Sequence, residues 1–137
     1  MDIAELRRKV LDASDLPRKK VHVAEWDVDV WVRTLTGAER DKLEVEWIKR
    51  RKLMARNDSD NTDFRAFVAC WTLCDESGVK IFDTHSDVNA LTKKSGAALQ
   101  SIWNVAAELN RFTESDVEEL AGNSEAGESA GSTSDSL

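Results

Sequence analysis

The chain has 137 residues, with 26 acidic and 19 basic side chains and a net charge of −7. This length suits one domain with a single hydrophobic core, and its apolar runs are too short for a membrane-spanning helix. The low pI, near 4.9, argues against general nucleic-acid binding, because binding to phosphates requires a surplus of cations. The N-terminus lacks a secretory signal pattern, and two cysteines make no disulfide framework, so we expect an intracellular protein.

Charge is unevenly distributed along the chain. Seven of the acids and none of the basic residues lie from Phe112 onward, which leaves 19 of each in residues 1–111. Residues 122–137 are mostly small, polar or acidic and hold too little apolar surface to order themselves. We therefore expect one mainly helical domain over residues 1–121, followed by a disordered acidic tail over residues 122–137.

The first predicted element is a short amphipathic helix over residues 2–12. Asp2 can cap it, and Pro17 follows it. Its apolar residues fall near one face: Ile3, Leu6, Val10 and Leu11.

A β-hairpin is predicted over about residues 19–35. Valine alternates with other residues in two runs, and the alternation changes phase around residues 25–27, which indicates a turn. One face is then formed by valines and packs on helices. The other face carries His22, Asp29, Trp31 and Arg33.

Helices are predicted to dominate the rest of the domain. Thr36 and Glu39 form a capping-box pattern before a helix over about 37–56, on which Glu46 and Arg50 are spaced as an exposed ion pair. A very apolar helix follows from residue 62 or 63 to about 74, and Gly78 suits a turn. Residues 79–82 are a candidate third short strand. A helix start at 83–86, a helix over 96–110 capped by Ser95, and a last short helix after residue 113 complete the pattern.

The predicted fold class is therefore α+β and mostly α. An N-terminal β-hairpin packs on a bundle of four to five helices.

No motif for bond-making chemistry is visible. Cys70 and Cys74 lie four apart on a predicted apolar helix, where they can share a face, yet the two histidines, His22 and His85, are not at ligand spacing. Free cysteines in such a segment behave as small buried hydrophobes. We expect no enzyme activity, no metal and no cofactor.

Two groups of residues are candidates for binding a partner. The first lies on the hairpin and the second on the long helix after it: Trp26, Trp31 and Arg33, then Lys49, Arg50 and Arg51. Trp31 points away from the valines, so either it is an exposed anchor or a second layer, such as the N-terminal helix, covers it. The basic cluster is either a solvated helix end that complements the helix dipole, a contact for an acidic partner or for phosphates, or a dock for the acidic tail.

An ordered series of cap, turn and core residues also runs through most of residues 19–123. The first part of the series is Leu35, Thr36, Glu39, Arg40, Val68, Cys74, Asp75, Gly78, Ile81 and Phe82. The second part is Leu99, Ile102, Leu109, Asn110, Val117, Glu118, Leu120 and Asn123. In this series the chain resembles the tail assembly chaperones of long-tailed bacteriophages.

The resemblance implies a function without catalysis. Such a chaperone binds the tape measure protein before assembly, helps recruit tail tube subunits, works in the host bacterial cytoplasm and is not retained in the virion. The acidic tail is what the shorter of two frameshift-related forms would show. A chaperone whose single copies bind a client weakly reaches high overall affinity when many copies bind the same client. We therefore also expect self-association. Two alternatives stay open: a DNA-associated phage regulatory or accessory protein that uses Lys49–Lys52, and a structural tail or head–tail completion protein.

Overall fold

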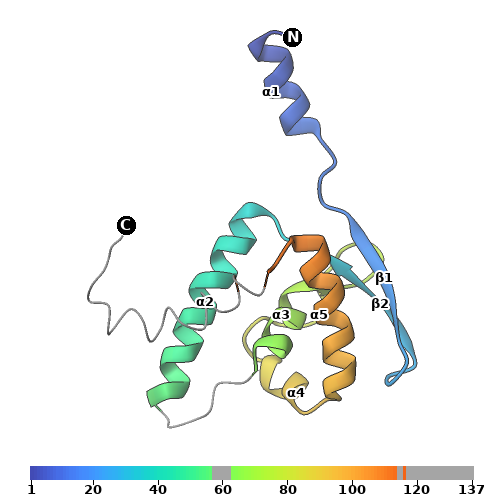
Figure 1. The fold of residues 1–137 in the computed structure, drawn as a ribbon, viewed down its shortest axis with the longest axis vertical. Coiled ribbons are helices and arrows are strands. Elements are labelled where there is room, and N and C mark those ends of the chain that lie inside the picture. Colours follow the sequence, from blue (N-terminus) through green and yellow to red (C-terminus); the bar gives the residue numbers. More distant parts are fainter. Residues whose placement is uncertain (57–62, 114–115, 117–137) are drawn as a thin grey trace.

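The computed structural model describes residues 1–56, 63–113 and 116 of the chain. Five helices and three short strands form within these residues (Figure 1). In chain order they are α1 (Ile3–Asp12), β1 (Arg18–Val23), β2 (Val28–Arg33), α2 (Gly37–Arg56), α3 (Phe64–Thr72), β3 (Leu73–Cys74), α4 (Val88–Thr92) and α5 (Gly96–Asn110). The predicted α+β, mostly helical class is confirmed. The predicted acidic tail and all but the first residues of the predicted last helix lie outside the described residues.

The hairpin forms as the valine pattern predicts. β1 and β2 pair antiparallel, with Val21 opposite Val30 and Val23 opposite Val28, and residues 24–27 make the turn. Val23, Val30 and Val32 are buried, because α5 contacts both strands. Val28 is exposed beside the turn, where the hairpin ends.

The third strand is not the predicted one. β3 pairs antiparallel with β2, with Leu73 opposite Val32 and Cys74 opposite Trp31, whereas the 79–82 segment contributes only a bridge from Lys80 to Cys74. The reason is burial, because Leu73 and Cys74 are both enclosed in the core. Extended backbone at Leu73 ends α3, so Cys74 lies on a strand, and the expected helical face shared with Cys70 is wrong.

The predicted capping box starts α2. The backbone N–H of Thr36 donates to Glu39 Oε1 at 2.9 Å, and the backbone N–H of Glu39 donates to Thr36 Oγ1 at 3.1 Å. The same carboxylate receives both Nη1 and Nη2 of Arg33 at 2.9 Å. This fork ties the end of β2 to the first turn of α2.

α3 is the centre of the core. All of its residues from Ala66 to Thr72 are buried, and Figure 1 shows it between α2 and α5. Aromatic rings join the three helices, since Phe64 contacts both Trp47 of α2 and Trp103 of α5 with centroids 4.7 and 5.5 Å apart. Edge-on contacts of this kind add to the free energy of apolar burial. The sequence patterns that placed Trp47, Trp71 and Trp103 on apolar helical faces are confirmed.

α1 stands apart from this body. None of its residues is buried, and Figure 1 shows it extending away beyond a short connection. Asp2 caps it as predicted, because Asp2 Oδ1 accepts the Glu5 backbone N–H at 2.8 Å. The connection is held at its base, where Thr34 Oγ1 donates to the Pro17 carbonyl at 2.6 Å. The interpretation in which the N-terminal helix covers Trp31 is therefore wrong.

Candidate interaction surfaces

The cysteines and histidines singled out in the sequence lie in separate surroundings, since both cysteines are buried and both histidines are exposed. Among the residues that the structure describes, no group of three or more His, Cys, Asp or Glu side chains is placed to hold a metal ion. Burial raises the pKa of the Cys70 thiol to about 12, which removes it as a nucleophile at neutral pH. His22 is exposed and bonds Asp29 Oδ1 at 2.8 Å. In the same part of the chain, no helix is both long and apolar enough to cross a membrane.

The three hairpin candidates are only partly available to a partner. Trp26, in the turn, is half-buried against the core. Trp31 is also half-buried and lies opposite Lys20 and Cys74, so its neighbours on the sheet cover part of it. The side chain of Arg33 is 12% exposed and is held by Glu39. Arg33 therefore acts first as a structural contact.

The three candidates on α2, which are Lys49, Arg50 and Arg51, have different neighbours. Nε and Nη2 of Arg50 both contact Asp63 Oδ2, at 2.9 and 2.6 Å, and Nη2 also donates to Asn89 Oδ1. The expected ion pair of Arg50 with Glu46 is wrong, because Arg50 turns toward the buried Asp63 while Glu46 lies 3.6 Å from the ammonium of Lys49. Lys49 is exposed and Arg51 is half-buried. The three candidates thus point in different directions around α2, and Arg50 is already engaged with Asp63 and Asn89.

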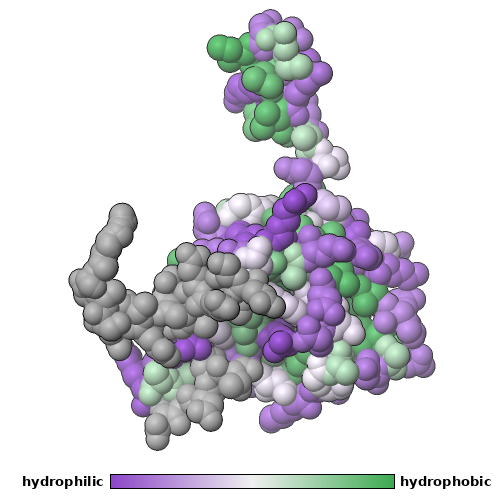
Figure 2. All heavy atoms as spheres, in the orientation of Figure 1, coloured by the Kyte–Doolittle hydropathy of each residue, from purple (hydrophilic) through white to green (hydrophobic). Residues whose placement is uncertain are grey.

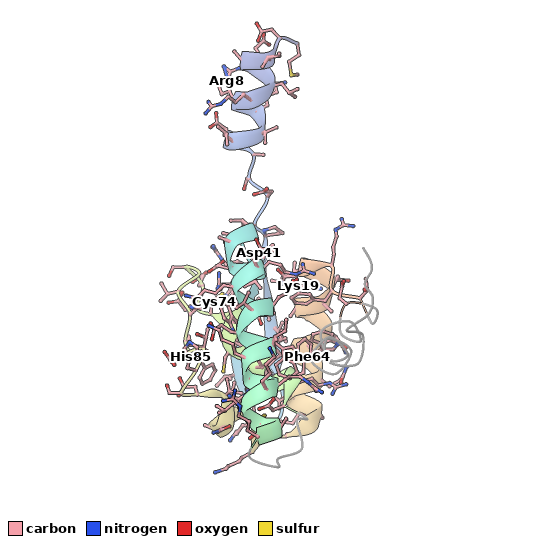
Figure 3. All side chains as sticks on the ribbon, turned by 90° about the vertical axis from the view of Figure 1, so that its left-hand side faces the viewer. Arg8, Lys19, Asp41, Phe64, Cys74 and His85 are labelled. Atoms are coloured by element: carbon pink, nitrogen blue, oxygen red, sulfur yellow. The ribbon has the colours of Figure 1, made fainter. Side chains whose placement is uncertain are left out.

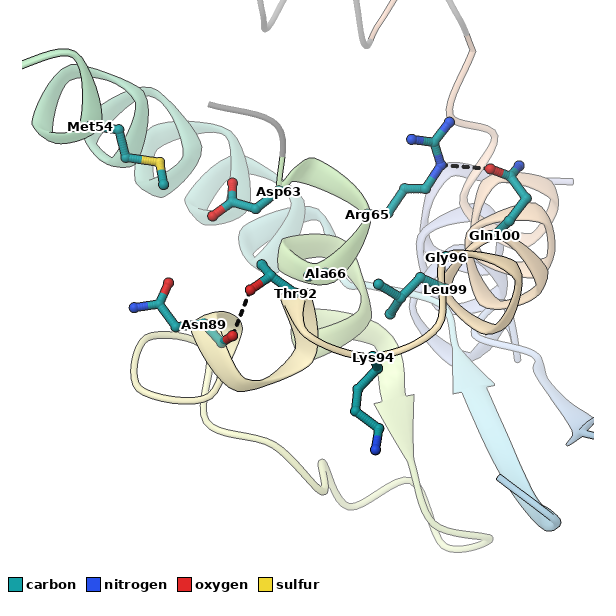
Figure 4. Close-up of a pocket in the computed structure, with 10 residues that line it drawn as sticks. All are labelled: Met54, Asp63, Arg65, Ala66, Asn89, Thr92, Lys94, Gly96, Leu99 and Gln100. Carbon is teal, nitrogen blue, oxygen red and sulfur yellow. Dashed lines mark hydrogen bonds between the residues drawn. The ribbon is translucent and has the colours of Figure 1, made fainter. Parts of the chain in front are cut away.

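A groove lies beside Arg50, where the end of α2 meets α3, α4 and the start of α5 (Figure 4). Its volume is about 600 Å³. Three apolar and seven other residues line it: Met54, Ala66 and Leu99, with Asp63, Arg65, Asn89, Thr92, Lys94, Gly96 and Gln100. No pattern in the sequence predicts this groove, because its walls come from four separate segments.

Hydrogen bonds fix the polar rim of the groove. Arg65 Nε donates to Gln100 Oε1 at 2.6 Å, which joins α3 to α5 across one wall. On the other wall, Thr92 Oγ1 donates to the Asn89 carbonyl at 2.6 Å. The surface of the groove is mainly polar, because Ala66 and Leu99 are almost wholly buried beneath it, so the groove can hold a side chain chiefly through hydrogen bonds at its rim.

The apolar face of α1 is a second surface. Ile3, Leu6, Val10 and Leu11 remain 54–84% exposed, and Figure 2 shows apolar side chains along this isolated helix. The sequence predicts the helix and its apolar face. Its one hint that the body leaves them uncovered is the mostly polar segment between Leu11 and Leu16.

These features define a small, mainly helical α+β protein with a groove between its helices and an isolated amphipathic helix. The chain belongs to the phage tail assembly chaperone family, whose family model matches residues 5–123. The resemblance seen in the sequence is therefore confirmed. No match was found among curated proteins or among solved structures.

Proposed function

We propose that this tail assembly chaperone binds the tape measure protein and helps recruit tail tube subunits during tail morphogenesis. Family membership supports a role in tail assembly, and the groove of about 600 Å³ is the observation that supports direct binding of another polypeptide. In this proposal the protein acts in the host bacterial cytoplasm, self-associates and leaves before the virion is complete.

The groove suits a client side chain that combines a short apolar stem with a polar end. Met54 offers apolar contact, while Lys94 and Gln100 offer hydrogen bonds to the client around it. One inserted side chain gives weak binding for each copy. Many copies along one long client then supply the overall grip, since each further contact on the same client is effectively intramolecular.

A groove-filling variant tests this binding. Gly96 is the first residue of α5 and lines the groove, and a Cβ added there meets nothing within 4 Å. Gly96→Trp should therefore fill the groove without straining the backbone. Gly37→Trp is the matched control, because Gly37 is the first residue of α2 and its surroundings are equally open.

Each variant is co-expressed with the tape measure protein and captured by affinity. We expect wild type and Gly37→Trp to retain and solubilise the client, and Gly96→Trp to lose most of it. Equal capture by both glycine variants would reject the groove as the contact. A client that is equally soluble alone and captured by no form of the chain would reject the proposed function.

Two further measurements test the rest of the proposal. Tail tube subunits should co-purify with the chaperone and client together, and their absence would reject recruitment. Purified virions should lack the chain by mass spectrometry, and its presence there at a fixed copy number would favour a structural completion protein.

A further inference from the structure

The outward face of α2 carries a row of cations. At 100° per residue, four exposed basic side chains of this helix fall within about 80° of one another: Lys42, Lys49, Lys52 and Arg56. Two apolar side chains lie among them, since Val45 and Leu53 are 51% and 57% exposed. Figure 3 shows α2 in front of the body, with Asp41 near its start. We call these four cations and two apolar residues the α2 stripe.

The stripe carries positive charge that its surroundings leave unbalanced. Lys49 lies 3.6 Å from Glu46, at the border of the stripe. Within the part of the chain that the structure describes, Lys42, Lys52 and Arg56 form no ion pair with an acid. A segment that covers the stripe should therefore be acidic and carry some apolar side chains for Val45 and Leu53.

A second run of cations, at the start of β1, already has acidic partners. Lys19 lies 3.5 Å from Glu108 of α5, and Lys20 lies 3.6 Å from Asp29 of β2. The acids of the body thus balance the hairpin lysines, whereas most cations of the α2 stripe have no such partner. The stripe is consequently the better surface for a further acidic segment.

The chain leaves the described body beside the start of α2. Arg40 holds this point, because its Nη1 donates to the Asn110 carbonyl at 2.7 Å and its guanidinium lies 4.2 Å from the centre of the Phe112 ring. Asp116, the last described residue, places Oδ2 3.8 Å from Arg40 Nη2. The same oxygen accepts the backbone N–H of Thr113 at 2.9 Å. The first described acid of the C-terminal segment is therefore already fixed against a cation of α2.

The residues that follow have the chemistry that the stripe requires. Residues 117–137 hold no Lys or Arg and five acids: Glu118, Glu119, Glu125, Glu128 and Asp135. Val117 and Leu120 supply apolar side chains among the first of these acids. We call residues 117–137 the acidic segment. Its charge and its apolar residues both match the stripe.

The acidic segment is long enough to lie along the stripe. Lys42 and Arg56 are 14 positions apart on α2, so the stripe spans about 21 Å. Arg40 faces away from the stripe, and the segment must pass around a helix about 10 Å wide to reach it. A flexible chain of 21 residues spans about 25 Å on average and about 70 Å when fully extended. Because the segment is tethered, its effective concentration at the stripe is on the order of millimolar, which favours even weak ion pairs.

We infer that the acidic segment docks along the α2 stripe of its own chain. The contact consists mainly of exposed ion pairs, so it is reversible and sensitive to salt. An acidic segment of a partner reaches the stripe only by displacing the chain's own segment, which therefore acts as a built-in competitor. This inference goes beyond the proposed function, because it requires neither the client nor the groove.

Carbodiimide cross-linking of the purified full chain tests the contact, because this reagent joins a lysine amine to a carboxylate only where the two groups touch. No Lys or Arg follows Arg111, so trypsin releases the C-terminal part as one peptide that begins at Phe112. Mass spectrometry then identifies the lysines joined to it. We expect Lys42, Lys49 and Lys52 to dominate, and the yield to fall in about 1 M salt, where the screening length is about 3 Å.

Charge reversal on the stripe gives a second readout that does not depend on the lysines it removes. Lys49→Glu combined with Lys52→Glu leaves Lys42 in place, and cross-links to Lys42 should fall at least about 5-fold. Lys19→Glu combined with Lys20→Glu is the matched control, because it makes the same change of charge on β1. It should leave the cross-links to Lys42 unchanged, and circular dichroism confirms that both variants are folded.

An equal mixture of unlabelled and isotopically labelled chains separates contacts within a chain from contacts between copies. Docking within one chain joins only peptides of the same label. Docking between copies joins peptides of different label in half of the products. We expect joined peptides of one label only.

Four outcomes would overturn the inference. Cross-links mainly to Lys19 and Lys20 would place the acidic segment on β1, and cross-links to Lys42 that survive the α2 charge reversal would remove the stripe as their cause. Differently labelled peptides in half of the products would place the segment on a second copy. A segment that forms no cross-link, in a wild type that retards DNA in gels while the α2 variant does not, would assign the stripe to nucleic acid. Capture of the client is measured separately through Gly96→Trp.

Discussion

The carboxylate of Glu39 should make the stability of this protein depend on acid pH. It accepts both Nη atoms of Arg33 and the backbone N–H of Thr36, each at 2.9 Å. These bonds, that with Arg33 first, lower the pKa of Glu39 from 4.5 to about 2, although burial opposes part of the effect. Replacing Glu39 with Gln keeps an oxygen for the Thr36 N–H but removes the charge that Arg33 binds.

The size of the effect follows from the change in pKa. A fall of about 2.5 pKa units corresponds to about 3 kcal/mol of stability at neutral pH. Because the Glu39 side chain is 31% exposed, solvent screens part of this, and we expect Glu39→Gln to cost about 1.5–2 kcal/mol. The folded state holds the carboxylate ionised, so this stabilisation is complete above pH 4.5. It is lost as the pH falls from 4.5 to about 2, where the folded protein also takes up the proton.

Urea unfolding followed by tryptophan fluorescence measures this difference. The free energies of unfolding of wild type and Glu39→Gln should differ by about 1.5–2 kcal/mol at pH 7 and converge toward pH 2. Glu44→Gln is the control, because Glu44 lies 3.8 Å from Arg40 in an i,i+4 pair and should cost no more than about 0.5 kcal/mol. A difference for Glu39→Gln that stays constant with pH, or that equals the control, would refute the reasoning.

Three other substitutions or treatments have defined outcomes. Asn110→Ala should lower the free energy of unfolding by about 2–3 kcal/mol in urea titrations, because Asn110 Oδ1 accepts the buried Leu35 N–H at 2.8 Å; a loss below 0.5 kcal/mol would contradict this. Arg50→Gln should cost about 3 kcal/mol, since it removes the guanidinium from the buried Asp63 carboxylate, whereas Lys49→Gln, at an exposed site, should cost under about 0.5 kcal/mol. Cys70 should react with a thiol reagent only as fast as the protein unfolds, and rapid labelling without denaturant would show that its burial is wrong.

The sequence determined the features that local interactions set. The helix caps at Asp2, Thr36 and Ser95 join residues three apart, so their side chains and backbone donors meet as soon as the helix forms. The hairpin likewise follows from the alternation of valine with other residues. A shift of the strand pairing by one residue would turn every valine of that strand to the opposite face of the sheet. The same cap, turn and core residues carried the family resemblance, and so the class of protein was visible before its fold.

The tertiary structure alone decided which residues meet across long stretches of sequence. Leu73 and Cys74 belong to the sheet and not to the predicted helix, because pairing with the edge of β2 buries them. Arg50 turned from Glu46 to Asp63, and the groove joined four segments that no local pattern connects. Whether α1 is covered was also beyond the sequence, because an amphipathic pattern shows that a helix needs a partner but not where that partner lies. Burial and exposure depend on the packing of distant parts of the chain, and only that packing left the apolar face of α1 exposed.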